Sequence, residues 1–371
     1  MNRIVPEPIS RQPWSLFVPL LLLVLFGAAV LHSAAGGSMT PYASSHLVRF
    51  GVFVLVALAL SFMTRRFVRL VAYPAYVAVL LLLVVVEAMG AIGGGSQRWI
   101  NIGPLVLQPS ELMKAAIVVV LARFFETLPV GMVNTWRALV PPLVMIGLPV
   151  MLVLTQPDLG TALAILFGGG LVMFFAGLPL RWFVGAGAAG ALVVPLAFFF
   201  LLQDYQQRRI TTLFDPGADP LGAGYHITQS KIAIGSGGWF GKGFGNGTQS
   251  HLNYLPEPHT DFVFATMAEE WGLAGGLFVL LMYLLILRWG FAVALSSEDR
   301  LGRLIAAGAV ATIFFYIAVN LLMVMGFAPV VGIPLPFLSH GGSALLTVMI
   351  CIGLLLMVHR WNTRVSPRGL S

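Results

Sequence analysis

Long apolar runs, separated by short polar connections, dominate the chain. Ten runs can be counted, each bounded by charges, prolines or glycine clusters. They predict membrane-spanning helices, because about 20 helical residues cross a bilayer, whereas membrane strands alternate apolar and polar positions. The runs cover residues 15–33, 47–63, 70–90, 111–127, 137–155, 160–176, 182–202, 262–287, 304–326 and 342–359.

Two features complicate this pattern without changing it. Pro141, Pro142 and Pro149 interrupt the fifth run and Pro195 the seventh, which a membrane helix tolerates when its neighbours satisfy the freed backbone groups. The first run has basic residues before it and small residues after it, as a signal peptide does, but its length favours a retained span. The predicted fold is an all-α, polytopic membrane protein with one membrane domain over residues 1–371.

Composition agrees with this class. Of the 371 residues 58% are hydrophobic and only 9% are charged, and the mean hydropathy is +0.92. Soluble domains carry roughly 25% charged residues, so a water-soluble enzyme is excluded. The single cysteine, Cys351, has no partner in the chain, which excludes a disulfide scaffold.

The basic residues give the orientation. Most of the 21 lysines and arginines flank the runs on the side that carries both termini, and by the positive-inside rule this side is the cytoplasm. Both termini are therefore expected to be cytoplasmic. The net charge of +7 then reflects orientation, and it gives no reason to expect a nucleic acid partner.

The longest connection, residues 203–260, lies between the seventh and eighth runs and is expected outside the membrane. A loop of this length in a compact protein is usually functional. Its middle, ITQSKIAIGSGGWFGKGFGNGTQS, is rich in Gly, Ser and Thr. Such a stretch either presents backbone N–H groups to an anion such as phosphate or is a flexible, turn-rich loop. It is no Walker motif, because Gly243 follows Lys242.

Asp261 is the first candidate for chemistry, because it ends this loop and begins the eighth run. Its carboxylate is either a helix cap or first-turn acid, or a general base whose pKa desolvation raises. Glu269 and Glu270 lie two turns deeper, where an acid faces a cavity or a structural partner. Gly272 and Gly276 are spaced as in a close helix-packing surface.

A second candidate group surrounds the start of the fourth run. Ser110 is the expected N-cap there and Glu111 a favourable first-turn acid, whereas Lys114 stands at the wrong end of the helix dipole. Lys114 therefore needs a negative partner, either Glu111 in a local salt bridge or a bound phosphate. Trp99 precedes this group as an interfacial aromatic residue, and Asp158 at the sixth run is expected to be a cap.

Metal binding is less clearly indicated. His251 and His259 flank the region of Glu257 and Asp261, but their spacing fits no zinc pattern. A divalent cation, Mg²⁺ or Mn²⁺, held between acids and a pyrophosphate would suit carboxylate ligands. The residues leave the identity of any metal open.

Four motifs occur in order along the chain, and together they resemble the SEDS family of cell-wall polymerases, which includes RodA, FtsW and SpoVE. The second and third motifs lie around the start of the sixth and eighth runs, and the third is more similar to RodA than to FtsW. His340 departs from the family, which usually carries Tyr at this place. The motifs are QRWINIGPLVLQPSELMK (97–114), QPDLGTA (156–162), GNGTQSHLNYLPEPHTDFVFATMAEEWG (245–272) and PFLSHGGSAL (336–345).

The resemblance implies a peptidoglycan glycosyltransferase that polymerises lipid II into glycan strands for cell elongation and rod shape. It implies an inverting reaction that forms a β-1,4 link and releases undecaprenyl pyrophosphate. Asp261 matches the family's essential aspartate and would be the general base. Lys114, Arg208 or Arg209 would offset charge on the pyrophosphate, and Trp99 and Glu111 would position the substrate.

The same resemblance implies partners and a location. The partners would be lipid II and the growing glycan strand, a class B penicillin-binding protein that acts as transpeptidase, membrane lipid and other membrane proteins of the elongation complex. The location would be the cytoplasmic (inner) membrane, with the active site on its outer face. Alternatives are a lipid II flippase, a polymerase of the division or sporulation type, and a scaffold without activity.

Overall fold

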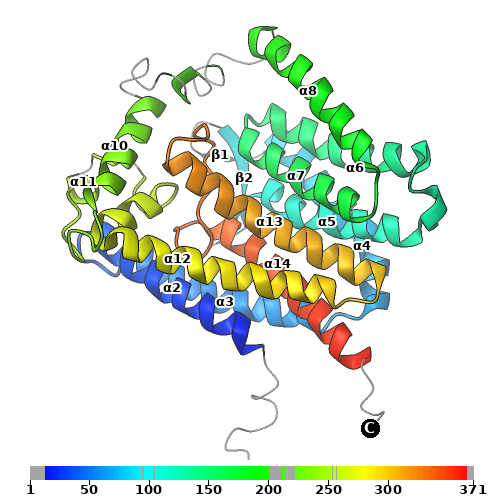
Figure 1. Ribbon diagram of the computed structural model, residues 1–371, viewed down its shortest axis with the longest axis horizontal. Coiled ribbons are helices and arrows are strands. Elements are labelled where there is room, and N and C mark those ends of the chain that lie inside the picture. Colours follow the sequence, from blue (N-terminus) through cyan, green and yellow to red (C-terminus); the bar gives the residue numbers. More distant parts are fainter. Residues whose placement is uncertain are drawn as a thin grey trace, which may run out of the picture.

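Each of the ten apolar runs forms one helix in the computed structural model (Figure 1). The structure describes residues 13–89, 91–93, 96–102, 105–200, 207, 211–213, 215, 222–252, 254–255 and 257–365. The predicted all-α fold is confirmed. The ten helices are α2 (Trp14–Ala34), α3 (Tyr42–Ser61), α4 (Arg65–Met89), α5 (Pro109–Thr127), α6 (Trp136–Thr155), α7 (Leu159–Phe175), α8 (Leu180–Phe200), α12 (Val263–Leu295), α13 (Arg300–Val324) and α14 (Gly342–Val365).

Eight of these helices are long and apolar enough to cross a membrane. The other two are α7, which is apolar but has 17 residues, and α5, which has 19 residues and includes the pair Glu111 and Lys114. Apolar side chains surround most of the helices on all sides, as expected where the solvent is lipid rather than water. The prolines predicted to interrupt α6 and α8 lie inside those helices.

Helix α13 lies at the centre of the bundle, where it packs against α5, α7, α12 and α14 (Figure 1). Its small residues allow its neighbours to approach closely. A Cβ atom added at Gly308 would lie 2.5 Å from the Val118 side chain and 2.7 Å from that of Val172, so this crossing with α5 and α7 requires glycine. Helix α8 differs from α13, because it extends away from the bundle and its apolar window buries no residue.

Helices α2 and α12 run antiparallel, since Ser33 at the end of α2 donates to Glu270 near the start of α12. At the opposite end of α12, Asn362 of α14 donates to the carbonyl of Val293 (3.2 Å). The start of α2 and the end of α14 therefore lie at one end of the bundle. The other end, where α12 and α14 begin, is called the cavity end below.

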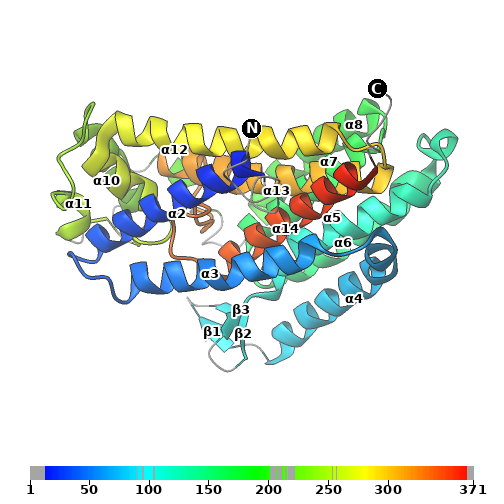
Figure 2. The ribbon, with the colours of Figure 1, turned by 90° about the horizontal axis from the view of Figure 1, so that it is seen from below.

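Two features of the fold had no counterpart in the hydrophobic pattern. A three-stranded antiparallel sheet, β1 (Ala91–Gly93), β2 (Ser96–Ile102) and β3 (Leu105–Leu107), connects α4 to α5 and projects beside the bundle in Figure 2. The connection 203–260 contains helices α10 (Ala223–Ser236) and α11 (Thr248–His251). Ser230 of α10 donates to the carbonyl of Val324 (2.7 Å), which fastens this connection to the end of α13.

Candidate active site

A cavity of about 330 Å³ opens at the cavity end. Strand β2, the starts of α5 and α7, the residues before α12 and the α13–α14 connection all contribute to its wall. Three predicted site residues, Trp99, Glu111 and Asp261, line it together although they are far apart in sequence. Its polar lining residues are Arg98, Trp99, Gln108, Glu111, Asp158, Thr161, Thr260, Asp261, His340 and Ser343.

The backbone that carries Asp261 into α12 is held from one side. Three successive carbonyl groups, those of residues 259, 260 and 261, each accept one hydrogen bond from α13 or from the α13–α14 connection. This arrangement fixes the backbone of Asp261. The donors are the backbone N–H of His340 to His259 (2.8 Å), the hydroxyl of Ser339 to Thr260 (2.6 Å) and the side-chain amide of Asn320 to Asp261 (2.8 Å).

Asp261 does not occupy the N-cap position of α12. That helix begins at Val263, its N-cap position is Phe262, and no side chain caps it. The helix-cap interpretation of Asp261 was therefore wrong, because the chain turns once more before the helix starts. The carboxylate instead borders the cavity, beside Gly332. A Cβ atom at Gly332 would lie 3.6 Å from Oδ2 of Asp261, and the positive φ of Gly332 (+70°) favours glycine.

Lys114 lies behind this wall rather than in it. Its side chain is 1% exposed, and its Nζ atom donates to Oε1 of Glu111 (2.5 Å) and to the hydroxyl of Tyr316 (2.9 Å). The Tyr316 hydroxyl in turn donates to Oε2 of Glu111. The local salt bridge, one of the two alternatives for Lys114, is confirmed. Because both oxygens of Glu111 are engaged, the triad fixes the side chain that reaches the cavity.

Ser110 is not the N-cap of α5, contrary to the prediction. The cap position is Gln108, no side chain caps the helix, and Pro109 takes the first helical position, where its missing N–H costs nothing. The Ser110 hydroxyl is buried without a hydrogen bond. The Gln108 amide donates to Oδ2 of Asp158 (3.0 Å), so it links α5 to α7.

Asp158 is the N-cap of α7, as predicted, since it accepts from the backbone N–H of Thr161 (3.1 Å). It also lies 3.9 Å from Nη1 of Arg98, a cavity-lining residue that the sequence analysis missed. The Arg98 guanidinium donates to the carbonyls of Gln156 (2.6 Å) and Pro157 (2.5 Å). Arg98 immediately precedes Trp99 in the first motif, so the sequence did place a cation there. Its partners at residues 156–158 are distant in sequence, and the pattern did not reveal them.

His340 forms the rim of the cavity with residues of α3. Its Nε2 atom lies 3.1 Å from Nη1 of Arg49, and its ring meets the edge of Tyr42. Burial lowers the pKa of His340, and the neighbouring positive charge of Arg49 lowers it further. Burial also lowers the pKa of His259, although Glu257 partly offsets this effect. Both shifts favour the neutral form of the ring.

Two predicted residues and the metal remain unplaced. Arg208 and Arg209 lie outside the described residues. Among the residues that are described, no three His, Cys, Asp or Glu side chains gather in a way that could hold a metal ion. In the cavity wall, Glu111 and Asp158 already have hydrogen-bond partners, so a preformed cage of carboxylates is not part of the described structure.

Comparisons with known proteins agree with this architecture. A family model described as a cell cycle protein, of the FtsW, RodA and SpoVE type, matches residues 13–364. The chain is 42% identical over 365 residues to the peptidoglycan glycosyltransferase MrdB of Escherichia coli K12, covering 97% of this chain and 96% of that protein. It is 39% identical over 284 residues to the stage V sporulation protein E of Bacillus subtilis, covering 76% of each.

Solved structures give the same result. A chain from a peptidoglycan synthase complex, described as coordinating polymerization and crosslinking, superposes with a TM-score of 0.83 at 35% identity, covering 95% of this chain and 98% of that one. A mutant of the rod shape determining protein RodA from Thermus thermophilus superposes with a TM-score of 0.71 at 32% identity, covering 94% and 98%. The chain is therefore a multi-pass membrane protein that belongs to the SEDS family of FtsW, RodA and SpoVE.

Proposed function

We propose that this protein is a peptidoglycan glycosyltransferase that polymerises lipid II. The single observation that carries the proposal is the cavity in which Asp261, Glu111 and Trp99 meet at the end of the bundle. The relatives named as peptidoglycan glycosyltransferases support it, because they match nearly the whole chain. The similarity to RodA favours a role in elongation and rod shape over a division or sporulation role.

The proposed reaction needs one base and a stabilised leaving group. The 4-hydroxyl of one GlcNAc attacks the anomeric carbon of a MurNAc, the bond from that carbon to the pyrophosphate oxygen breaks, and an α linkage becomes a β-1,4 linkage. Asp261 accepts the hydroxyl proton as the attack proceeds. The three hydrogen bonds to the carbonyls of residues 259–261 keep this carboxylate in place, so that little reorganisation is needed.

Charge that builds on the pyrophosphate needs a cation at the cavity. Lys114 was the sequence-based candidate, but its Nζ atom is buried and engaged by Glu111 and Tyr316. We therefore assign Lys114 to holding Glu111. We assign the pyrophosphate to Arg98, because its guanidinium lines the cavity, although the carbonyls of Gln156 and Pro157 already hold it in place. Arg208 and Arg209 stay proposals for the same task.

A divalent cation, Mg²⁺ or Mn²⁺, also stays a proposal. Magnesium is commonly bound by one or two carboxylates together with substrate phosphates and water. The carboxylates that line the cavity, those of Glu111, Asp158 and Asp261, are the side chains that could supply such a ligand. The ion would then arrive with the pyrophosphate and neutralise part of its charge.

The surroundings of the cavity suit a substrate that is half lipid. An apolar cavity of about 420 Å³ lies between α7 and α13 and shares Val331 with the polar cavity. A polyprenyl chain needs such a surface while its sugars need water. We propose accordingly that the protein lies in the cytoplasmic membrane with the cavity end at the outer face. Both termini are then in the cytoplasm.

Its proposed protein partner is a class B penicillin-binding protein that crosslinks the new strands. The support is the similarity to a chain of a peptidoglycan synthase complex that coordinates polymerization and crosslinking. Other membrane proteins of an elongation complex complete the proposed assembly.

The test is polymerisation of purified lipid II by the reconstituted protein, with and without its cognate transpeptidase. Asp261→Asn should lower the rate by at least about 100-fold, the lower range for loss of a general base. Glu257→Gln is the matched control, because this acid lies four residues earlier and its side chain is 61% exposed. Polymer from Asp261→Asn at the wild-type rate would refute the assignment. A protein that moves lipid II between leaflets but makes no polymer would be a flippase.

A further inference from the structure

Helix α12 is interrupted at Gly272, eleven residues after Asp261. Gly272 has φ 62° and ψ −157°, far from helical values. Its spacing from Gly276 predicted a close helix-packing surface, but in the structure Gly272 breaks the helix. Backbone groups freed inside a membrane must find other partners, because lipid offers none.

Residues 237–244, called the interruption loop here, supply those partners. A Cβ atom at Gly241 would lie 2.0 Å from the carbonyl oxygen of Glu270, so only glycine allows this approach. Two N–H groups of the stretch that the sequence suggested for anion binding, those of Lys242 and Gly243, donate to carbonyls of α12 instead. The bonds run from the N–H of Leu273 to Gly238 (2.9 Å), from Ala274 to Trp239 (3.1 Å), from Lys242 to Glu269 (2.9 Å) and from Gly243 to Glu270 (3.1 Å).

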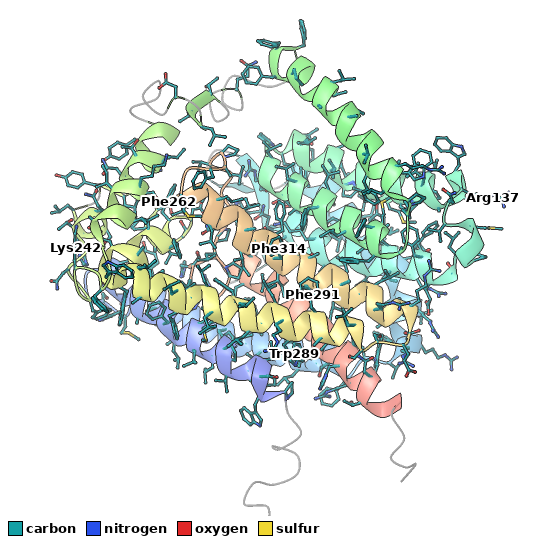
Figure 3. The ribbon with its side chains drawn as sticks, in the orientation of Figure 1. Arg137, Lys242, Phe262, Trp289, Phe291 and Phe314 are labelled. Carbon is teal, nitrogen blue, oxygen red and sulfur yellow. The ribbon has the colours of Figure 1, made fainter. Side chains whose placement is uncertain are left out.

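Side chains also hold the interruption loop against α12. The Glu269 carboxylate is fully buried, and its Oε1 atom accepts from Nζ of Lys242 (2.6 Å) and from the hydroxyl and N–H of Thr248 (2.9 and 3.0 Å). Figure 3 shows Lys242 at the end of the molecule where α10 and α11 lie. The one polar side chain of the loop, Lys242, is therefore bonded to α12, and the loop is fixed to the helix rather than free in solution.

Two of the three aromatic side chains of the loop are largely exposed, whereas Phe244 packs beside Trp271 of α12. Trp239 is 72% exposed and Phe240 is 84% exposed, unusually high values for such large apolar side chains. Trp239 and Phe240 continue a stripe of exposed apolar side chains on α12. This stripe begins at the residues of α12 that are hydrogen-bonded to the loop. The stripe consists of Trp271, Leu273, Leu277, Leu280, Leu281 and Leu284.

The depth of the loop follows from the length of α12. Its 33 residues span roughly 50 Å at 1.5 Å per residue, more than the roughly 30 Å of bilayer hydrocarbon. The exposed apolar side chains of α12 continue past Arg288 to Leu295, so the far edge of the hydrocarbon lies between these two residues. From Arg288 and Leu295 to Ala274, which bonds Trp239, the helix rises about 21 Å and about 32 Å. The loop therefore meets α12 at or inside the near edge of the hydrocarbon.

We propose that the interruption loop is a re-entrant membrane anchor, whose Trp239 and Phe240 side chains insert into the lipid leaflet at the cavity end. Lipid is the occupant because the patch is continuous with the apolar stripe that a membrane protein exposes to lipid. The anchor fixes the second half of the connection 203–260 against the bilayer beside the cavity. The proposal does not depend on the glycosyltransferase assignment.

The single cysteine makes this testable by spin labelling. Cys351 is buried, so Cys351→Ala gives a cysteine-free background for single cysteines introduced at Trp239 and Phe240. Leu277→Cys is the lipid-facing control and Glu257→Cys the aqueous control. The labelled proteins are reconstituted in phosphatidylcholine–phosphatidylglycerol vesicles, and collision rates of the label with oxygen and with a water-soluble nickel chelate are measured.

Labels at 239 and 240 should match position 277, with high oxygen and low nickel accessibility. Nickel accessibility equal to that at position 257 would show that the loop lies in water and would overturn the proposal. Low accessibility to both reagents would show a protein occupant and would overturn it as well. If a cysteine variant does not fold, quenching of tryptophan fluorescence by brominated lipid provides the second measurement. Trp239→Phe should then lose a quenchable component that the wild type has.

Discussion

Asn320 holds the backbone of Asp261 from the central helix. Its side-chain nitrogen donates to the carbonyl of Asp261 (2.8 Å) and also to that of Ile333 (2.7 Å), and the residue is fully buried. One amide thus joins the segment that carries the proposed base to the neighbouring segment 331–334, which also lines the cavity. The position of the carboxylate depends on a residue that does not line the cavity itself.

We expect Asn320→Ala to lower the polymerisation rate by at least about tenfold, mainly through kcat, because two buried carbonyls lose their donor and Asp261 is released. The measurement is lipid II turnover at several substrate concentrations. Asn362→Ala is the matched control, since Asn362 also joins a helix to a carbonyl, but at the other end of the bundle. Equal losses in both variants would indicate a general effect on folding.

Lys114 and Glu111 should behave as a pair. Lys114→Met leaves the Glu111 carboxylate buried without its ammonium partner, and loss of one member of a buried pair costs about 3–5 kcal/mol. The double variant Lys114→Met/Glu111→Gln should recover most of that loss. Thermal unfolding in detergent measures the effect. A double variant that is no more stable than Lys114→Met would contradict the structural role given to this lysine.

Gly332→Ala tests the space beside the Asp261 carboxylate. The residue has φ +70°, which an alanine adopts at a cost of about 1–3 kcal/mol, and the added methyl would lie 3.6 Å from Oδ2 of Asp261. We expect lower stability and at least a tenfold loss of activity. Gly170→Ala on α7 is the control, because nothing lies within 4 Å of its added Cβ. Full activity of Gly332→Ala would argue that the carboxylate works elsewhere in the cavity.

The sequence predicted the helices well because each needs only a long apolar run, whose position does not depend on distant residues. It also identified Asp261, Glu111 and Trp99, which line one cavity. It missed Asn320 and Arg98, whose importance arises from contacts with backbone carbonyls that no spacing reveals.

The misplaced caps have a similar cause. A serine or aspartate near a helix start predicts a cap, but whether the chain turns before or after it is decided by neighbouring segments. At Asp261 a turn precedes α12, in which the Glu257 carbonyl accepts from the N–H groups of Thr260 and Phe262, and the α13–α14 connection bonds to this turn through Ser339. At Ser110 the preceding Pro109 already starts the helix, so that the hydroxyl lies inside it. The short strands β1 and β3 likewise form through pairing with β2, which is a tertiary contact.

His340→Tyr should remove part of the acid sensitivity of the protein. Burial and Arg49 hold the pKa of His340 below its usual value of about 6.5, so the unfolded chain binds its proton first as the pH falls. The stability that the neutral ring contributes is therefore present above pH 6.5 and is lost as the pH falls toward the lowered pKa. Protonation also prevents Nε2 from accepting the hydrogen bond of Arg49 (3.1 Å).

We expect the melting temperature of the wild type to fall more steeply than that of His340→Tyr between pH 7.5 and 5.5. His259 has a pKa shifted in the same direction and titrates in both proteins, so the difference between the two curves reports on His340 together with its coupling to His259. Tyrosine cannot take up a proton in this range, but its hydroxyl can accept from Arg49 as the imidazole does. The variant should therefore keep its polymerase activity at pH 7.5. If the melting temperatures of the two proteins fall equally as the pH is lowered, His340 does not contribute to the acid sensitivity of the protein.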